Sequence, residues 1–339
     1  MRSRPRVARL VLVLAHAVHI GVLSSVADQA PRGPEIAFSS ARAGGLEIYV
    51  MNPDGGGVRS LTQLGGYALQ PRWAPDGRTI VFSWASLGDT QHAKLYMMRA
   101  DGAQVTQLTG EPGARDTSPT WSPDGRHIAF ASDRPGLTGT HIYVMDADGR
   151  NTRRVTLDAV FDGAYNELPS WSPNGGEIAF TSWRVTAEAF AVTPNGQQVR
   201  QITNDGMWNL SARWSPDGRE LALASCSTAV FPQTDIYVVD ADGRDRAQLV
   251  AHPHRDRFPA WSPDGSRIVF ERFWVAGGVA DVYVVDRGGG RARNLTRHPQ
   301  RDWAGDWFDP AALSVSSFGK HGVPWGWLKA LVWQSRIRL

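Results

Sequence analysis

Oxygen-bearing side chains recur at one regular position of this sequence. Five of them stand five residues before a tryptophan, and Ala68 takes this place in a sixth copy: Asp116, Asn166, Asn209, Asp256 and Asp302. Carboxylate and amide oxygens can bind a hard cation, so one hypothesis is a central ion such as calcium held by the three aspartates. The alternative is structural, with each side chain accepting hydrogen bonds from amides of its own loop.

The residues one position earlier vary more and include no acid. They are Tyr67, Arg115, Tyr165, Trp208, Arg255 and Arg301. Aromatic and arginine side chains are enriched where proteins bind partners. These six side chains, with the Asp/Asn set beside them, predict a site that grips a peptide or an extended polar ligand. In the structural alternative, each arginine pairs with a neighbouring acid instead.

The element that must position these residues is a repeated motif. "PTWSPDGRHIAF" begins at Pro119, and its relatives place tryptophans at positions 73, 121, 171, 214 and 261, a period of 43 to 50 residues. Such a period indicates a propeller or a solenoid. A catalytic residue is needed once, so five copies favour a structural role: a Pro-Asp-Gly turn and an indole that fills the wedge between blades.

A second recurring segment, "IYVMDADG" and its relatives, occurs six times and is followed each time by a short strand. Each unit therefore has four short β-runs, A to D, with tight turns after A and after C. The first unit lacks run A, whereas the segment near Trp307 is a run A without a following B. Joining the two ends predicts an all-β, six-bladed propeller of four-stranded antiparallel blades over residues 34–310, closed by the C-terminal strand.

This topology sorts the connections onto two faces. The uniform A–B and C–D turns form a flat face, and the variable B–C and D–A loops form the opposite one, here called the loop face. Variable loops on a rigid scaffold are where recognition usually lies. Because run A is innermost, the candidate residues are predicted to ring the mouth of the central channel on the loop face.

The repeats "WSPDG…IAF" and "IYVMDADG" resemble PD40 (WD40-like) repeats of TolB-like periplasmic proteins over residues 34–310. The resemblance implies a non-catalytic propeller that binds a protein or peptide in the cell envelope. Only a few residues precede the first blade, so we expect this chain to lack the N-terminal α/β domain of TolB. Some related propellers are lyases that hold a metal with loop histidines. The alternative is therefore a metal-assisted polysaccharide lyase or hydrolase at the same mouth, using His92, His141, His252, His254 or His298.

The two ends differ from the body. Residues 1–27 combine four arginines, an apolar run and a Ser-Val-Ala cleavage site, which predicts a signal peptide and a periplasmic or secreted protein; an uncleaved anchor is the alternative. Residues 318–339 form a basic, Trp-rich tail that lies on a membrane, packs on the rim or is disordered.

Charge and cysteine content narrow the partner classes. Removal of the leader changes the formal charge of +3 to −1, and removal of the four basic tail residues leaves about −5 on the body. This charge gives no support for nucleic-acid binding, and we expect no nucleic-acid partner. Cys226 is the single cysteine, so no internal disulfide can form. We expect a monomer without a resident cofactor, whose membrane contact is limited to the tail.

Overall fold

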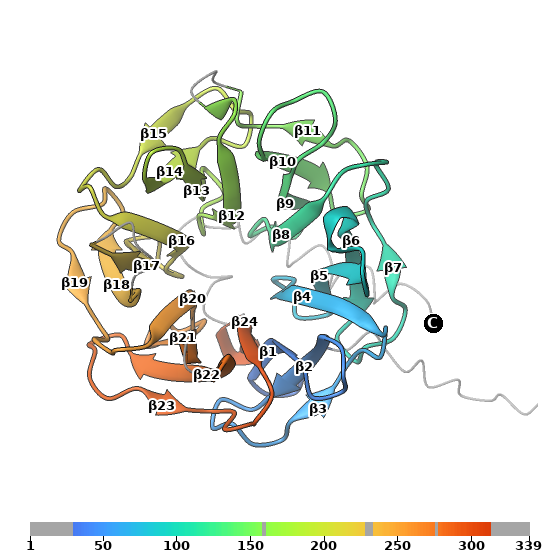
Figure 1. Cartoon of the computed structure of the whole chain (residues 1–339), viewed down its shortest axis with the longest axis vertical. Coiled ribbons are helices and arrows are strands. Elements are labelled where there is room, and N and C mark those ends of the chain that lie inside the picture. Colours follow the sequence, from blue (N-terminus) through green and yellow to red (C-terminus); the bar gives the residue numbers. More distant parts are fainter. Residues whose placement is uncertain (1–29, 158–160, 228–232, 275–276, 313–339) are drawn as a thin grey trace, which may run out of the picture.

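Six four-stranded antiparallel sheets stand around a central axis, which confirms the predicted propeller (Figure 1). A computed structural model of the chain describes residues 30–157, 161–227, 233–274 and 277–312. The predicted signal peptide and the basic tail lie outside the described residues.

Strands A and B form the inner half of each blade. The innermost strands, A, are β24 (Asp302–Phe308), β4 (Gly66–Trp73), β8 (Asp116–Trp121), β12 (Tyr165–Trp171), β16 (Trp208–Trp214) and β20 (Arg255–Trp261). The B strands are β1 (Glu35–Ser40), β5 (Thr79–Ser86), β9 (His127–Ser132), β13 (Ile178–Trp183), β17 (Glu220–Cys226) and β21 (Arg267–Trp274). In this order the sheets are called blades 1 to 6.

Strands C and D form the outer half. The C strands are β2 (Glu47–Met51), β6 (Lys94–Arg99), β10 (His141–Asp146), β14 (Ala187–Val192), β18 (Asp235–Asp240) and β22 (Val279–Asp286). The D strands are β3 (Arg59–Ser60), β7 (Thr106–Gln107), β11 (Arg153–Arg154), β15 (Val199–Gln201), β19 (Ala247–Gln248) and β23 (Arg293–Asn294). A short 3-10 helix, η1 (Thr90–His92), lies in the B–C loop of blade 2.

Blade 1 closes the ring with strands from both ends of the chain. The C-terminal strand β24 pairs antiparallel with β1, and Trp307 lies opposite Ile36. This pairing confirms that the segment near Trp307 completes the N-terminal blade. It also removes the open edges that a linear stack of sheets would expose.

The blades are held together by one apolar cluster at each of the six blade interfaces. In the cluster between blades 2 and 3, Trp121 packs with Val81, Leu95 and Phe130. The indole N–H of Trp121 also donates a hydrogen bond of 3.3 Å to the backbone oxygen of Arg72 in the preceding blade. The motif tryptophan therefore fills the wedge between blades, as the repeat pattern predicts.

The A–B turns are built by the polar residues of the motif. In blade 3, the Asp124 carboxylate accepts hydrogen bonds from the Ser122 hydroxyl and from the backbone amide of Arg126. These bonds, led by the one from Ser122, lower the pKa of Asp124. Gly125 takes a positive φ of 69°, which a residue with a side chain rarely adopts. Ser, Asp and Gly of the motif thus stabilise a turn.

A bulge divides every A strand into two parts. The register shifts between Leu69 and Arg72 in β4, and Gln70 between them has a φ of 56°. Ser118, Leu168, Ser211 and Phe258 have the same positive φ at the same place in the next four blades. A bulge bends a strand and re-aims its side chains. The residues before it reach the loop face, and those after it line the flat end of the channel.

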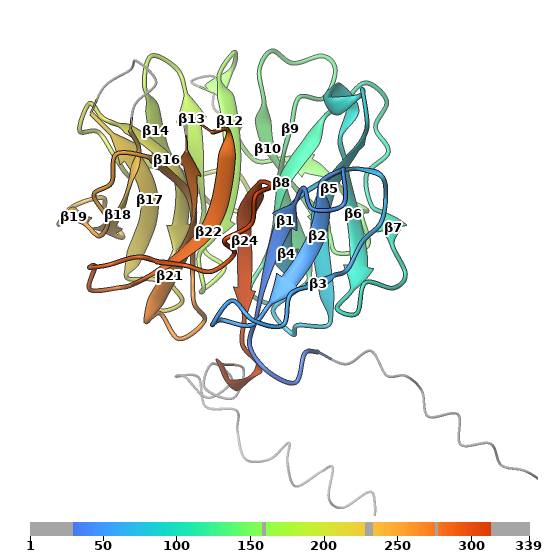
Figure 2. The same ribbon diagram turned by 60° about the horizontal axis from the view of Figure 1, so that its bottom comes forward.

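The loop face and the flat face lie on opposite sides of the disc. Figure 2 shows the long loops and η1 on one side, and both ends of the described chain on the other. The described residues contain no helix long and apolar enough to cross a membrane.

A first prediction concerns ring closure at Gly305. A Cβ at this position would overlap the backbone oxygen of Ala37 and lie 2.7 Å from Pro71 Cγ. We expect Gly305→Ala to lower the free energy of unfolding by about 1–3 kcal/mol, because overpacking forces the backbone to shift. Gly110→Ala is the control, since a Cβ there meets nothing within 4 Å and should change stability by less than about 0.5 kcal/mol. Equal urea midpoints for the two variants would contradict this account of the seam.

A second prediction isolates the hydrogen bond between blades. The Trp261 indole donates to the Arg213 backbone oxygen at 3.0 Å, whereas the Trp214 indole N–H has no partner among the described residues. Both side chains are buried. Trp261→Phe should therefore destabilise the protein by about 1 kcal/mol more than Trp214→Phe, since only the first removes a hydrogen bond. Chemical unfolding of both variants measures this difference.

Candidate binding site at the channel mouth

The six positions of the Asp/Asn set lie at the loop-face ends of the A strands and are fully buried. Ala68, Asp116, Asn166, Asn209, Asp256 and Asp302 all have 0% exposed surface. In this arrangement their side chains contact protein groups and offer no surface to a ligand. The prediction that they form part of a binding site stays untested, and their contacts favour the structural alternative.

Each aspartate of the set faces an arginine of its own blade. The pairs are Asp256 with Arg272 at 2.7 and 2.8 Å, Asp302 with Arg42 at 2.9 Å, and Asp116 with Arg134 at 3.8 Å. The Asp116 pair is the loosest, because neither carboxylate oxygen accepts a hydrogen bond from a described residue. Burial raises the pKa of Asp256 to about 6, and its bonds to Arg272 act in the opposite direction. A calcium ion shared by the three aspartates would have to displace three guanidinium groups.

The paired arginines are also stacked on aromatic rings. The guanidinium carbon of Arg272 lies 4.6 Å from the ring centre of Tyr283, and that of Arg134 lies 4.9 Å from Tyr143. Such cation–π contacts stabilise a buried cation. In blade 2, where Ala68 replaces the acid, Trp84 packs on Tyr96 instead of an arginine. Blade 5 differs again, since its arginine, Arg246, lies over Tyr237 and donates to the neutral Asn209.

The side chains of the two asparagines form hydrogen bonds with backbone and side-chain groups. The Asn166 amide donates to the backbone oxygens of Thr140 and Phe161. The Asn209 amide donates to Glu188 Oε2 at 3.0 Å, and its oxygen accepts from the Ser225 hydroxyl. Both side chains thus support loops and neighbouring strands.

Three residues of the variable set come together on the loop face of blades 2 to 4. Arg115 and Tyr165 line a pocket of about 370 Å³ with Thr90, Thr140 and Glu167. Arg115 and Thr90 also line an adjoining pocket of about 230 Å³, whose wall includes Tyr67 and Thr117. The two pockets form one continuous region around Arg115, which we call the Arg115 region.

Two acids of this region, Asp133 and Glu167, were not predicted from the sequence, and Asp133 accepts from the backbone amide of Arg115 at 2.6 Å. Burial raises the pKa of Glu167, and the positive charge of Arg115 opposes this rise. Glu167 stands two residues after Tyr165 on strand β12, so the same face of the strand carries both. Inspection of alternate residues after the variable position would have found it.

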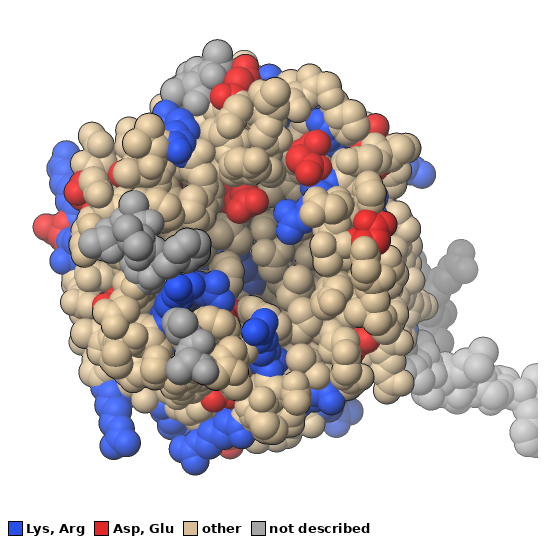
Figure 3. Space-filling model, viewed as in Figure 1, with Lys and Arg blue, Asp and Glu red and all other residues tan. Residues whose placement is uncertain are grey.

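The other three variable residues lie outside the Arg115 region. Trp208 packs edge-on against Trp183, with ring centres 5.4 Å apart. Arg301 lies over the ring of Phe273 and donates to the backbone oxygen of Gly278. Arg255 begins strand β20 and is half-buried. Figure 3 shows lysine and arginine side chains gathered beside the central hollow on the part of the loop face that blades 6 and 1 form.

Exposed apolar side chains accompany the Arg115 region. Leu87, Leu137 and Val185 belong to the B–C loops of blades 2, 3 and 4 and are 58%, 40% and 94% exposed. Tyr165 is 60% exposed at the mouth itself. The described loop face thus has exposed apolar side chains on the B–C loops of blades 2 to 4, and basic side chains beside the central hollow over blades 6 and 1.

The candidate histidines do not form one cluster. His92 bonds to Asp89 at 2.7 Å, and the buried His141 contacts Thr156 and Thr138. Burial lowers the pKa of His141 and favours its neutral form. His252 and His254 pack together with ring centres 5.0 Å apart. Among the described residues, no group of three or more His, Cys, Asp or Glu side chains is arranged to hold a metal.

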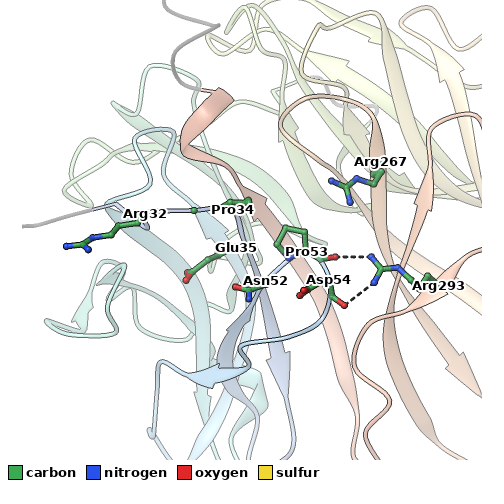
Figure 4. A pocket seen from close by; sticks show the side chains of 9 residues that line it. Arg32, Pro34, Glu35, Asn52, Pro53, Asp54, Arg267 and Arg293 are labelled. Carbon is green, nitrogen blue, oxygen red and sulfur yellow. Dashed lines mark hydrogen bonds between the residues drawn. The ribbon is translucent and has the colours of Figure 1, made fainter.

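A separate pocket lies on the flat face at the seam between blades 6 and 1. It measures about 520 Å³ and includes Arg32, Glu35, Asp54, Arg267 and Arg293. Figure 4 shows Arg293 reaching across the seam, where it donates to the backbone oxygens of Pro53 and Asp54. Arg267 lies over the ring of Trp307, 4.9 Å from its centre. These arginines join the closing blade to its neighbour.

Solved structures with the same fold include TolB proteins and an enzyme. TolB from Acinetobacter baumannii is 20% identical with a TM-score of 0.68, over 81% of this chain and 66% of its own length. A protein of Agrobacterium tumefaciens assigned as TolB is 21% identical with a TM-score of 0.60, over 78% of this chain and 88% of its own. An oligogalacturonate lyase from Vibrio parahaemolyticus is 13% identical with a TM-score of 0.51, over 74% of this chain and 86% of its own. At these identities the likeness shows the fold alone.

The repeats themselves match a family model over most of the propeller. The TolB beta propeller domain model, PD40, matches residues 71–206 and 168–314. These overlapping matches span more than half of the chain and cover blades 2 to 6 and the closing strand. The chain therefore belongs to the PD40 family of TolB β-propeller domains.

Proposed function

We propose that this protein is a non-catalytic binding module of the cell envelope, which holds a protein or peptide partner at the loop-face mouth of the channel. Membership of the TolB propeller family supports a TolB-like, non-catalytic role. The observation that carries the choice of site is the Arg115 region, where Tyr67, Arg115 and Tyr165 meet beside exposed apolar side chains.

The chemistry of the mouth indicates the kind of segment that would fit. Tyr165, Leu87 and Val185 offer apolar surface that association would remove from water. Arg115 presents a planar fork suited to a carboxylate, and further basic side chains lie across the mouth (Figure 3). A peptide with apolar side chains near the Arg115 region and acidic side chains across the mouth would match this surface.

An envelope location is part of the proposal. The predicted leader of residues 1–27 and the resemblance to TolB-like periplasmic proteins support export. We propose that the mature protein is periplasmic or secreted.

The alternative function is a metal-assisted polysaccharide lyase or hydrolase. Its support is the fold-level likeness to oligogalacturonate lyase and the adjacent pair His252 and His254. Metal analysis of the purified protein and assays on acidic polysaccharide, with and without added transition metal, distinguish the two functions. Cleavage that requires metal would favour the lyase.

The third prediction tests the binding site. Arg115→Ala and Tyr165→Ala should each weaken capture of a partner from an envelope extract by at least about tenfold, the scale of one lost anchor contact. The wild-type protein, tagged and immobilised, is compared with each variant, and the captured partner is then titrated in purified form.

Arg78→Ala serves as the matched control, because Arg78 is an exposed arginine on the flat face of blade 2. Its affinity should equal that of the wild type. If Arg78→Ala loses the partner while Arg115→Ala and Tyr165→Ala retain it, the binding surface is the flat face and the proposed site is wrong.

A further inference from the structure

The flat end of the channel contains a second cavity, of about 570 Å³, on the axis of the propeller. It lies after the bulges of the A strands and shares no residue with the Arg115 region. The residue directly before each motif tryptophan lines it. Around the ring, from blade 1 to blade 6, these residues are Asp306, Arg72, Thr120, Ser170, Arg213 and Ala260.

Two arginines of this ring face the axis from opposite blades, 2 and 5. Arg72 and Arg213 are each only 7% exposed. Each donates to backbone oxygens of the preceding A strand: Arg72 to Gly305, and Arg213 to Pro169 at 2.7 Å. The buried Nε–H of Arg213 has no hydrogen-bond partner among the described residues.

The arginines of the cavity are not ion-paired within the described part of the chain. No ion pair within 4 Å joins Arg72 or Arg213 to a described carboxylate, whereas the equally buried Arg272 has Asp256. Asp306 is the one acid in the ring of six, and its Oδ2 accepts from the backbone amide of Trp73 at 2.9 Å. A second acid, Asp309, also lines the cavity, where its carboxylate accepts from the backbone amide of Ala311. Both carboxylates thus bond to backbone amides, and neither guanidinium group has an ion pair among the described residues. Burial accordingly lowers the pKa of both arginines, and that of Arg213 the most.

The fold itself does not require arginine at these positions. Thr120, Ser170 and Ala260 occupy the same place in three other blades, and those blades have the same strands and bulges. A buried charge without a charged partner destabilises a protein. Two such guanidinium groups face one cavity from opposite sides, and a ligand whose oxygens pair with them best explains their presence.

We propose that this cavity binds a small organic acid, whose carboxylate or phosphate oxygens lie between Arg72 and Arg213. The motif tryptophans and the turn prolines, such as Trp121 and Pro123, line the rest of the cavity and suit an apolar body. Its volume lies within the range of about 300–1,000 Å³ typical of small-molecule sites. The site is independent of the loop-face function, so either proposal can fail alone.

Equilibrium dialysis with coloured probes tests the proposal. The purified protein is dialysed against 4-nitrobenzoate, 4-nitrophenyl phosphate and the uncharged 4-nitrobenzamide. Saturable binding of one or both anions, with binding of the amide weaker by at least about tenfold, is expected because charged acceptors bond guanidinium groups more strongly. The preferred anion identifies the head group. The proposal is overturned if neither anion binds, or if the amide binds equally well.

Variants locate the site. Arg72→Gln and Arg213→Gln should each weaken binding of the preferred anion by about 10- to 100-fold, as expected for loss of a charge-assisted contact. Arg78→Gln removes an exposed charge from the same blade and should leave the affinity unchanged. Circular dichroism checks folding, and Arg213→Lys, which keeps the charge but loses the fork, replaces any variant that does not fold. Equal affinity in the wild type and the folded Arg72 and Arg213 variants would overturn the assignment.

Discussion

Every blade of this propeller depends on an apolar contact with the blade before it. A four-stranded sheet buries its two faces only when neighbours cover both, and six apolar clusters provide that cover around the ring. The motif tryptophan fills the wedge at each interface. The pairing of β24 with β1 completes blade 1, whose free face then packs on blade 6. Loss of closure would expose two blade faces at once, so the ring is the unit of stability.

A buried network of polar side chains, repeated from blade to blade, holds the loop-face ends of the strands in place. Buried acids, amides and arginines connect strands A, B and C, and aromatic rings pack against the arginine cations. Because buried polar groups are costly when unpaired, this network allows few other arrangements of the strand ends. The variable residues next to it are thereby held on a rigid base, which suits recognition without a large ordering cost.

Function in this fold depends on where the repeats differ. At the loop face, the difference places exposed apolar side chains on the loops of blades 2 to 4 and basic side chains across the channel mouth, as Figure 3 shows for the basic ones. At the flat end, it places two arginines where other blades have threonine, serine or alanine. The bulge in each A strand changes the direction of the side chains that follow it, so one strand contributes residues to the loop face and to the flat end of the channel.

The sequence by itself determined the number of blades, the strand order, the ring closure and the turn chemistry. These features depend on short segments, in which a continuous apolar run and a Ser-Pro-Asp-Gly turn lie within a few residues, so each repeat can be recognised by itself. The tertiary structure alone decided that the Asp/Asn set is buried. Its arginine partners are sixteen or more residues away in the chain, as with Asp256 and Arg272. It also decided that Tyr67, Arg115 and Tyr165 meet in adjoining pockets, and that Arg72 and Arg213 face one cavity. These contacts depend on the angle between blades and on side-chain packing, which a short sequence pattern does not indicate.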